Sequence, residues 1–180
     1  LIHNDAIFFG TETGDFFCSD FSGKVHWRIN AKRAVTSSPR IQDNVVYFSS
    51  IDGMLYAIDA KTGWTLWRFR MDRGSVSTPY ITERFAYIGS ADGHIYCVNL
   101  QSAKEVWHFK TEHQVSSSPI IYKDALYCGS VDGNLYCLDA KSGHLRWNFA
   151  TDDPITGSAI IHDDIVYIGS TDHKLYALPA

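Results

Sequence analysis

Apolar and polar residues alternate along this chain in short runs, and no run keeps a helical period for three turns. In the segment from residue 36 to residue 70, the apolar runs contain Tyr47, Ala57 and Trp67, and turn-forming residues bound each run. Alternation with period two between turn residues predicts β-strands. We expect four short strands here, at about residues 36–41, 45–50, 54–59 and 64–70, that form a small antiparallel sheet.

This pattern repeats about every forty residues. The clearest marker is one tryptophan in each copy, at Trp27, Trp67, Trp107 and Trp147. An Asp-Gly pair also recurs in register, as Asp52-Gly53, Asp92-Gly93 and Asp132-Gly133, and becomes Asp172-His173 in the last copy. A period of this length indicates a solenoid, a propeller or an array. We expect about four and a half units, at about residues 1–30, 36–70, 76–110, 116–150 and 156–178.

The Asp-Gly pairs predict tight hairpins. Asp-Gly between two strands is the preferred sequence of a two-residue type I′ turn. If Asp132-Gly133 is such a turn, Gly129 lies opposite Tyr136, and Cys128 lies opposite Cys137. Cysteines that face each other in this way are close enough for a disulfide.

A second explanation of the cysteines stays open. Cys18, Cys97 and Cys137 occupy a position of the repeat that Ala57 and Ala177 fill in other copies, so they can be small buried apolar residues. The alternatives for Cys128 and Cys137 are therefore a cross-strand disulfide and two buried thiols. Four cysteines without metal-ligand spacing do not fix the redox compartment.

A longer motif lies between the last two strands of a copy. Residues 57–63 read Ala-Ile-Asp-Ala-Lys-Thr-Gly and are followed by Trp67, and residues 137–143 with Trp147 repeat the pattern. This resembles the pyrroloquinoline-quinone-type (PQQ-like) propeller repeat, in which Ala-x-Asp-x-x-Thr-Gly precedes a tryptophan. The third copy departs from the motif, with Asn99, Ser102 and Ala103 at the positions of Asp, Thr and Gly, but keeps its tryptophan. The WD-type repeat has a similar period, but no tryptophan here is followed by Asp.

The resemblance implies an all-β fold, a β-propeller of four-stranded antiparallel blades. In that family the indole docks between neighbouring blades, and the motif is called the tryptophan-docking motif. The residues assigned to docking by this resemblance are Trp27, Trp67, Trp107, Trp147, Asp59, Thr62, Gly63, Asp139 and Gly143. Because the family usually closes its ring with more blades, we expect either a longer propeller or two chains that associate edge to edge.

Part of the family consists of quinone-dependent dehydrogenases, which the resemblance associates with calcium-binding Glu, Asn and Asp residues, a general-base Asp and often two adjacent cysteines. No two cysteines are adjacent here. The prominent aspartates recur in register, which favours a structural role: Asp52, Asp92, Asp132 and Asp172 in the turns and Asp59 and Asp139 in the docking motif. We therefore expect a non-enzymatic scaffold or sensor domain without a cofactor, and the alternative is a fragment of a PQQ-dependent dehydrogenase.

Other chemistry receives little support. The net charge of −4 and the scattered Lys and Arg residues argue against nucleic acid as a partner, and no apolar run is long enough for a transmembrane helix. The eight histidines show no zinc-ligand spacing. Hydroxyl-rich stretches such as Thr36-Ser37-Ser38 begin the innermost strands and are expected to line the central channel. The family resemblance favours a periplasmic or extracellular location.

We expect a protein or another macromolecule to bind the loops of one face. The connections that lead into each new copy differ most among the copies, at residues 30–34, 70–74, 110–114 and 150–154, and variation on a constant scaffold is where specificity can reside. Trp64 has no tryptophan counterpart in the other copies. We consider it a candidate partner contact.

Overall fold

The computed structural model describes residues 1–180 and consists of nineteen β-strands without a helix. They form five antiparallel sheets, here blades 1 to 5, in which strands pair in sequence order. Blade 1 contains β1 (Ile2–His3), β2 (Ala6–Gly10), β3 (Asp15–Ser19) and β4 (Val25–Asn30), and blade 2 contains β5 (Arg40–Gln42), β6 (Val45–Ser49), β7 (Met54–Asp59) and β8 (Thr65–Arg70). Blade 3 contains β9 (Tyr80–Ile81), β10 (Phe85–Gly89), β11 (His94–Asn99) and β12 (Glu105–Lys110).

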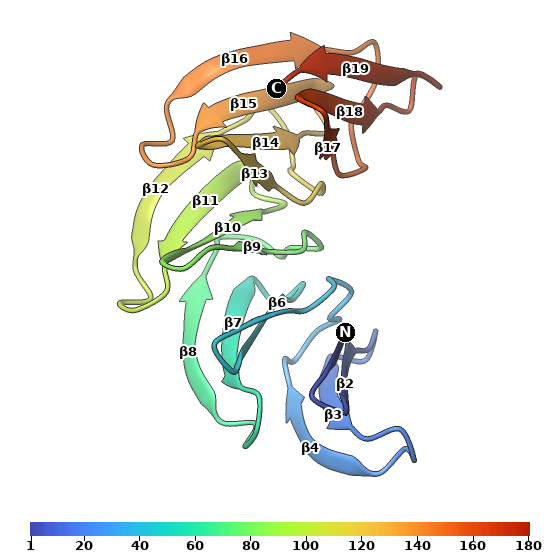
Figure 1. The fold of residues 1–180 in the computed structure, drawn as a ribbon, viewed down its shortest axis with the longest axis vertical. Coiled ribbons are helices and arrows are strands. Elements are labelled where there is room, and N and C mark those ends of the chain that lie inside the picture. The colour runs from blue at the N-terminus through green and yellow to red at the C-terminus, as the bar shows by residue number, and fades with distance from the viewer.

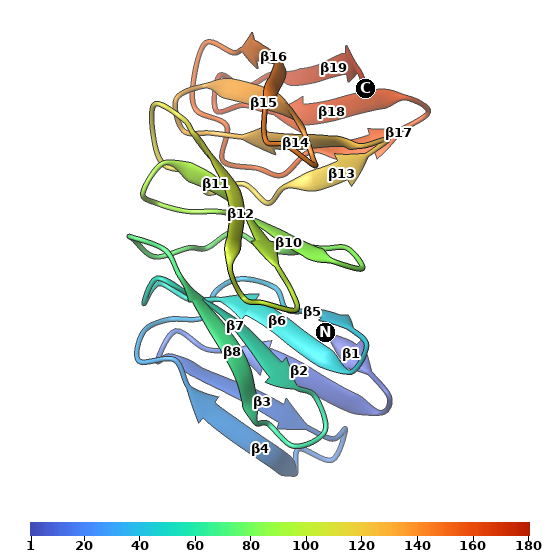
Figure 2. The same ribbon diagram turned by 90° about the vertical axis from the view of Figure 1, so that its left-hand side faces the viewer.

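Blade 4 contains β13 (Ile120–Tyr122), β14 (Ala125–Gly129), β15 (Asn134–Asp139) and β16 (Leu145–Ala150). Blade 5 has three strands, β17 (Ile160–His162), β18 (Ile165–Gly169) and β19 (Leu175–Pro179). The blades stand side by side in an open arc, with the first and last at opposite ends (Figure 1). Viewed from the convex side, the outer strands β4, β8 and β12 lie in front of the other strands (Figure 2). The predicted β-propeller fold with about four and a half blades is confirmed.

The apolar core lies between the blades. The central strands are buried on both faces, so their apolar residues run without alternation: in β7, Leu55 faces blade 3 and Tyr56 faces blade 1. Between blades 1 and 2, the rings of Phe16 and Phe48 stack with centroids 4.0 Å apart. Stacked twisted sheets bury apolar area on every face except the two at the ends of the arc.

Each junction between blades has its own apolar core. Between blades 2 and 3 the core includes Leu55 and Ile88, and the buried Tyr47 ring lies beside Trp67, with centroids 5.9 Å apart. Since apolar burial is the main favourable term in packing, these cores hold the array together.

The Asp-Gly turns have a different geometry from the predicted one. In blade 4, Gly133 N donates to Ser130 O at 3.1 Å and Ser130 N donates to Asn134 O at 3.0 Å. Of the three loop residues, only Gly133 has a positive φ, at 86°. This is a three-residue hairpin loop, a type I turn followed by a glycine bulge, and the predicted two-residue type I′ turn is wrong.

The longer loop shifts the register by one residue. Gly129 pairs with Leu135, and Cys128 pairs with Tyr136, so the predicted pairs of Gly129 with Tyr136 and of Cys128 with Cys137 are both wrong. A one-residue shift moves a side chain to the other face of the sheet. Cys128 packs between blades 3 and 4 and Cys137 between blades 4 and 5.

All four cysteines are free and buried. Cys128 Sγ lies 3.3 Å from Ser117 Oγ, and burial raises the pKa of the Cys97 and Cys128 thiols to about 12. Because the thiolate is the reactive form, these side chains are inert apolar residues. Of the two alternatives, the structure has the buried thiols.

Type I′ turns occur elsewhere in the blades, between the first and second strands. Asp43 and Asn44 connect β5 to β6 with φ of 50° and 62°. Three further turns have the same two positive φ values, at Asn4-Asp5, Lys123-Asp124 and Asp163-Asp164. Asn and Asp tolerate this conformation better than most residues, so these hairpins form without glycine.

The hydroxyl-rich stretches join the inner strands of successive blades. Ser38 N donates to Thr78 Oγ1 at 3.1 Å, and Thr78 N donates to Ser118 Oγ at 2.9 Å. Ser118 N donates to Ser158 Oγ at 2.9 Å. Each hydroxyl therefore satisfies a backbone N–H of the preceding blade.

The thiols provide a direct check of the corrected register. The native protein should react slowly with a thiol reagent, because all four thiols are buried and protonated. After denaturation without reductant, colorimetric titration should find four free thiols per chain. Titration of only two free thiols would contradict the four buried thiols and favour a disulfide between Cys128 and Cys137.

Candidate functional site

The indole of blade 3 contacts the turn that joins β15 to β16 in blade 4. Trp107 Nε1 donates to Ala140 O at 3.1 Å, and the hydroxyl of Tyr87 donates to the same oxygen at 3.1 Å. Gly143 has a φ of 75°, and a Cβ there would lie 2.6 Å from the Trp107 ring. Only glycine meets both the conformational and the steric requirement.

The junction of blades 1 and 2 repeats this arrangement. Trp27 Nε1 donates to Ala60 O at 3.0 Å. A Cβ on Gly63 would lie 2.7 Å from the Trp27 ring, and φ of Gly63 is again 75°. Phe8 takes the place of the tyrosine in this blade, so the carbonyl receives the indole alone.

The junction of blades 2 and 3 differs. Trp67 packs against the cluster there, but its Nε1 donates no hydrogen bond within the chain. Ala103 occupies the glycine position with a φ of 55°, and its methyl group takes up space that an indole fills between blades 1 and 2 and between blades 3 and 4. A cleft of about 250 Å³ lies at this junction, lined by Tyr47, Leu100 and neighbouring polar residues.

The fourth repeat tryptophan, Trp147, lies on β16 of blade 4. Its ring packs against the cluster between blades 4 and 5, and its centroid is 5.8 Å from that of Tyr127. Blade 5 has no fourth strand in this chain and therefore no equivalent docking turn. The structure thus brings the sequence-assigned glycines together with Trp27 and Trp107, and not with Trp67 or Trp147.

The carboxylates of the docking turns hold the turns themselves. Asp59 Oδ1 accepts hydrogen bonds from the hydroxyl and the N–H of Thr62, at 2.7 and 2.8 Å. Asp139 does the same with Ser142 and also binds Arg146 Nη2 at 2.6 Å. The guanidinium of Arg146 and the donors of Ser142 hold the pKa of Asp139 well below its usual range. Both carboxylates act on the backbone of their own turn.

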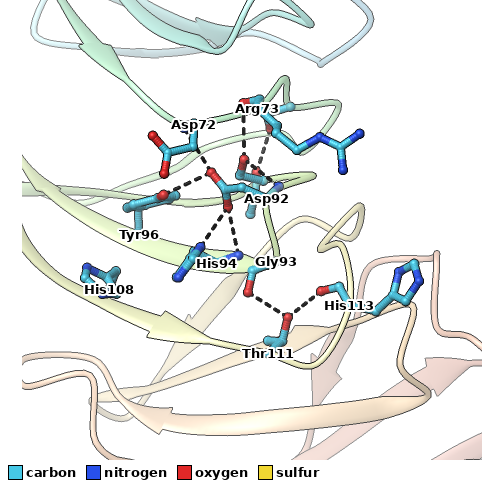
Figure 3. Close-up of polar contacts among 12 residues, drawn as sticks. Asp72, Arg73, Asp92, Gly93, His94, Tyr96, His108, Thr111 and His113 are labelled. Atoms are coloured by element: carbon cyan, nitrogen blue, oxygen red, sulfur yellow. Dashed lines mark hydrogen bonds and ion pairs between the residues drawn. The ribbon is translucent and has the colours of Figure 1, made fainter.

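In blades 3, 4 and 5, the aspartate of the turn between the second and third strands joins the blade to the connection before it. Asp92 Oδ1 accepts from His94 N at 3.0 Å, and Oδ2 accepts from the Tyr96 hydroxyl at 2.9 Å (Figure 3). Asp72 N, from the connection between blades 2 and 3, donates to the same Oδ2 at 3.1 Å. Asp132 and Asp172 repeat all three contacts. These carboxylates are engaged in the scaffold.

Each connection between blades is fixed at both ends and exposed in the middle. Between blades 3 and 4, the hydroxyl of Thr111 donates to Gly93 O at 2.9 Å, and Val115 N donates to Ser90 O at 2.9 Å. Thr111 and Val115 are buried, and Glu112 and His113 between them are exposed. His113 points away from the turn (Figure 3). Its side chain is therefore available at a fixed position.

The exposed pairs at the middle of the four connections form what we call the connection face: residues 32–33, 72–73, 112–113 and 152–153. They lie at the same end of the blades, because hydroxyls of the Asp-Gly turns bond the carbonyls of all four connections. Their charge changes in order along the arc: Lys-Arg, then Asp-Arg, then Glu-His, then Asp-Asp. The face is positive beside blade 1 and negative beside blade 5. Lys174 Nζ neutralises part of the negative end, at 2.6 Å from Asp152 Oδ2.

Trp64 lies at the other end of blade 2, directly after the docking turn. The residue is 75% exposed, and Leu66, two positions further along β8, is 51% exposed. Trp64, just before β8, and Leu66, within β8, together expose a large apolar surface on the outer edge of blade 2.

No three or more His, Cys, Asp or Glu side chains are arranged to hold a metal ion. The carboxylates most prominent in the sequence are bonded to turn backbone, hydroxyl groups and Arg146, as described above. This donor set does not fit a calcium-bound quinone. The structure also has no helix of the length and hydrophobicity that crossing a bilayer requires.

The repeated blades, the indole contacts and the linking carboxylates define the class, a β-propeller built from PQQ-like repeats. The family model of the outer membrane protein assembly factor BamB matches residues 1–78 and 52–180. The chain belongs to this family, and the resemblance to PQQ-like repeats is confirmed. None of the curated proteins is significantly similar to it in sequence.

Solved structures show the same fold. BamB from Moraxella catarrhalis superposes with a TM-score of 0.86 at 20% identity, over 98% of this chain and 59% of that chain. The computationally designed Ika8 gives 0.88 at 16% identity, over 100% and 57%. The designed Ika4 gives 0.73 at 18% identity, over 81% and 91%. The chain therefore spans less than two thirds of the length of BamB from M. catarrhalis and of Ika8.

The indole hydrogen bonds allow the stability of two blade junctions to be compared by mutation. Trp107→Phe keeps an aromatic ring but removes the N–H that Ala140 O accepts, and should lower the free energy of unfolding by about 1–2 kcal/mol or more. Trp67→Phe, the matched change at a position without this bond, should lower it less. Urea unfolding of both variants gives the comparison. Equal losses would show that the indole N–H contributes nothing at the junction of blades 3 and 4.

Proposed function

We propose that the chain is a non-enzymatic scaffold that binds a protein partner through the connection face. The observation that carries the proposal is the contrast between constant anchors and variable apices. The anchors recur in all four connections, because the backbone N–H groups of Ala31, Met71, Thr111 and Thr151 each donate to the carbonyl of a turn glycine. The residues held between them differ in charge from one connection to the next.

The order of the charges along the connection face indicates how charge should be distributed on the partner. A surface that is positive at Lys32-Arg33 and negative at Asp152-Asp153 favours a protein with acidic groups over blades 1 and 2 and basic groups over blades 4 and 5. Complementary charge chiefly raises the association rate and selects orientation. Rigid anchoring lowers the cost of ordering the loops on binding. Both effects suit a recognition surface.

A catalytic role has no comparable support. The recurrent aspartates are hydrogen-bonded to turns and connections of the scaffold, and the buried thiols are protonated. The dehydrogenase alternative would need a set of calcium ligands, and the carboxylates of this chain are used otherwise. We therefore propose binding without catalysis, and the protein partner is preferred over nucleic acid because the chain carries a net charge of −4.

The family also supports a proposed location and a second mode of association. The description of the family names an outer membrane protein assembly factor, which agrees with the periplasmic or extracellular location that we propose.

The outward face of blade 5 carries exposed Ile160 and Leu175, which line a cleft of about 480 Å³. The outward face of blade 1 carries exposed Phe9. These apolar faces agree with both alternatives, further blades of a longer propeller or the edge-to-edge association of two chains.

Charge reversal tests the connection face. Lys32→Glu combined with Arg33→Glu should weaken capture of the partner at least about tenfold at low salt, and the difference should shrink as salt rises. The bait is the full chain in an extract of the source cells, with captured proteins quantified against the wild type. Lys141→Glu, an exposed lysine at the opposite end of blade 4, is the control. Equal capture by all three proteins would reject the connection face.

Trp64 gives an independent test at the opposite end of the blades. We propose it as a further partner contact, since a large exposed aromatic ring is a typical anchor of an interface. Trp64→Lys, which installs the residue found at position 104 of blade 3, should leave the melting temperature unchanged and reduce capture. Unchanged capture would show that Trp64 only covers its own blade.

A further inference from the structure

Two histidines on blade 3 depart from the pattern of the other blades. His94 lies on β11 and His108 on the outer strand β12, next to each other (Figure 3). Their ring centroids are 5.1 Å apart, with the ring planes at 90°. Across the two strands, His94 pairs with Lys110 and Tyr96 pairs with His108, so the two rings are diagonal neighbours on one face of the sheet.

The same two positions carry mutually bonded side chains in other blades. In blade 4 they are Asn134 and Asn148, and Asn148 Nδ2 donates to Asn134 Oδ1 at 2.9 Å. In blade 1 they are Asp15 and Arg28, which form an ion pair at 2.7 Å. The two histidines make no hydrogen bond to each other, and each bonds a different carboxylate. The scaffold therefore does not require imidazoles here.

The carboxylates fix how each ring is protonated. His94 Nδ1 lies 3.1 Å from Asp92 Oδ1, and His108 Nδ1 lies 2.7 Å from Glu105 Oε1. An ionised carboxylate only accepts, so Nδ1 is the donor in both rings, and Nε2 of the neutral ring keeps its lone pair. No group of the chain bonds either Nε2. Histidines that bind metals typically have this arrangement, with a carboxylate on the other nitrogen.

Distance, access and charge also suit a cation. Two imidazoles that bind one tetrahedral ion through nitrogen have centroids about 5 Å apart. The side chains of His94 and His108 are 21% and 50% exposed, so an ion can reach them from solvent. Asp92 and Glu105 contribute two negative charges beside the single positive charge of Lys110.

We propose that His94 and His108 together bind one divalent transition-metal ion through their Nε2 atoms. Imidazole pairs suit Zn²⁺ and Cu²⁺, and Cu²⁺ is bound more tightly by a given set of nitrogen ligands. Water completes the coordination, because the chain supplies two ligands. The ion crosslinks β11 to β12 at the convex edge of blade 3. Asp92 contacts both this site and the connection face, through His94 Nδ1 and Asp72 N, and the proposal does not depend on the proposed partner.

Calorimetric titration of the full chain with ZnCl₂, and separately with CuSO₄, tests the site. The wild type should bind one ion per chain. His94→Asn combined with His108→Asn installs the pair that blade 4 already carries, so the variant should fold, and it should bind either ion at least tenfold more weakly. The electron paramagnetic resonance spectrum of the Cu²⁺ form should show two nitrogen ligands in the wild type.

His162→Asn is the matched control. His162 is an exposed histidine that lies 3.3 Å from Asp163, without a second histidine beside it, and its replacement should leave binding unchanged. The proposal is overturned if the wild type binds neither ion, if the double variant binds as tightly as the wild type, or if His162→Asn abolishes binding. In the first case, the two rings form an edge-to-face contact only. Circular dichroism and a thermal melt establish that each variant is folded.

Discussion

The packing of one sheet against the next is the interaction on which this structure depends. A four-stranded blade has two apolar faces and can bury them only against its neighbours, so each blade is stable as a member of the array. The stacked rings of Phe16 and Phe48 show how closely the sheets approach. The hydroxyl bonds of the inner strands and the carboxylate bonds of the turns then set the positions of blades 2 to 5 relative to one another.

The junctions are built from the same parts and are not equal. Where a glycine with positive φ faces the indole, as at Gly143, the ring reaches the carbonyl of the docking turn. Between blades 2 and 3, Ala103 occupies the position of that glycine, and Trp67 donates no hydrogen bond to the docking turn. One methyl group thus coincides with a cleft and a missing hydrogen bond.

The functional features that we propose lie at positions where the copies differ in sequence while the supporting hydrogen bonds recur. The connections carry different charged residues between the same backbone anchors, and we propose that they form a recognition surface. The pair of His94 and His108 follows the same logic, because asparagines or an ion pair serve the scaffold at that position in other blades. Differences among copies are informative here because the copies provide an internal standard for what the fold requires.

The amino-acid sequence by itself determined the fold class, the number of blades and the residues available at each junction. Period-two alternation, turn residues and evenly spaced tryptophans report on local structure and on which faces are buried. It did not determine the register of the Asp-Gly hairpins, since Asp-Gly suits both a two-residue turn and a glycine bulge, and a one-residue difference separates Cys128 from Cys137. It also gave no signal for the histidine pair, because residues 94 and 108 meet only through cross-strand pairing. Tertiary structure decided these points, since they depend on which atoms lie across a strand or a blade.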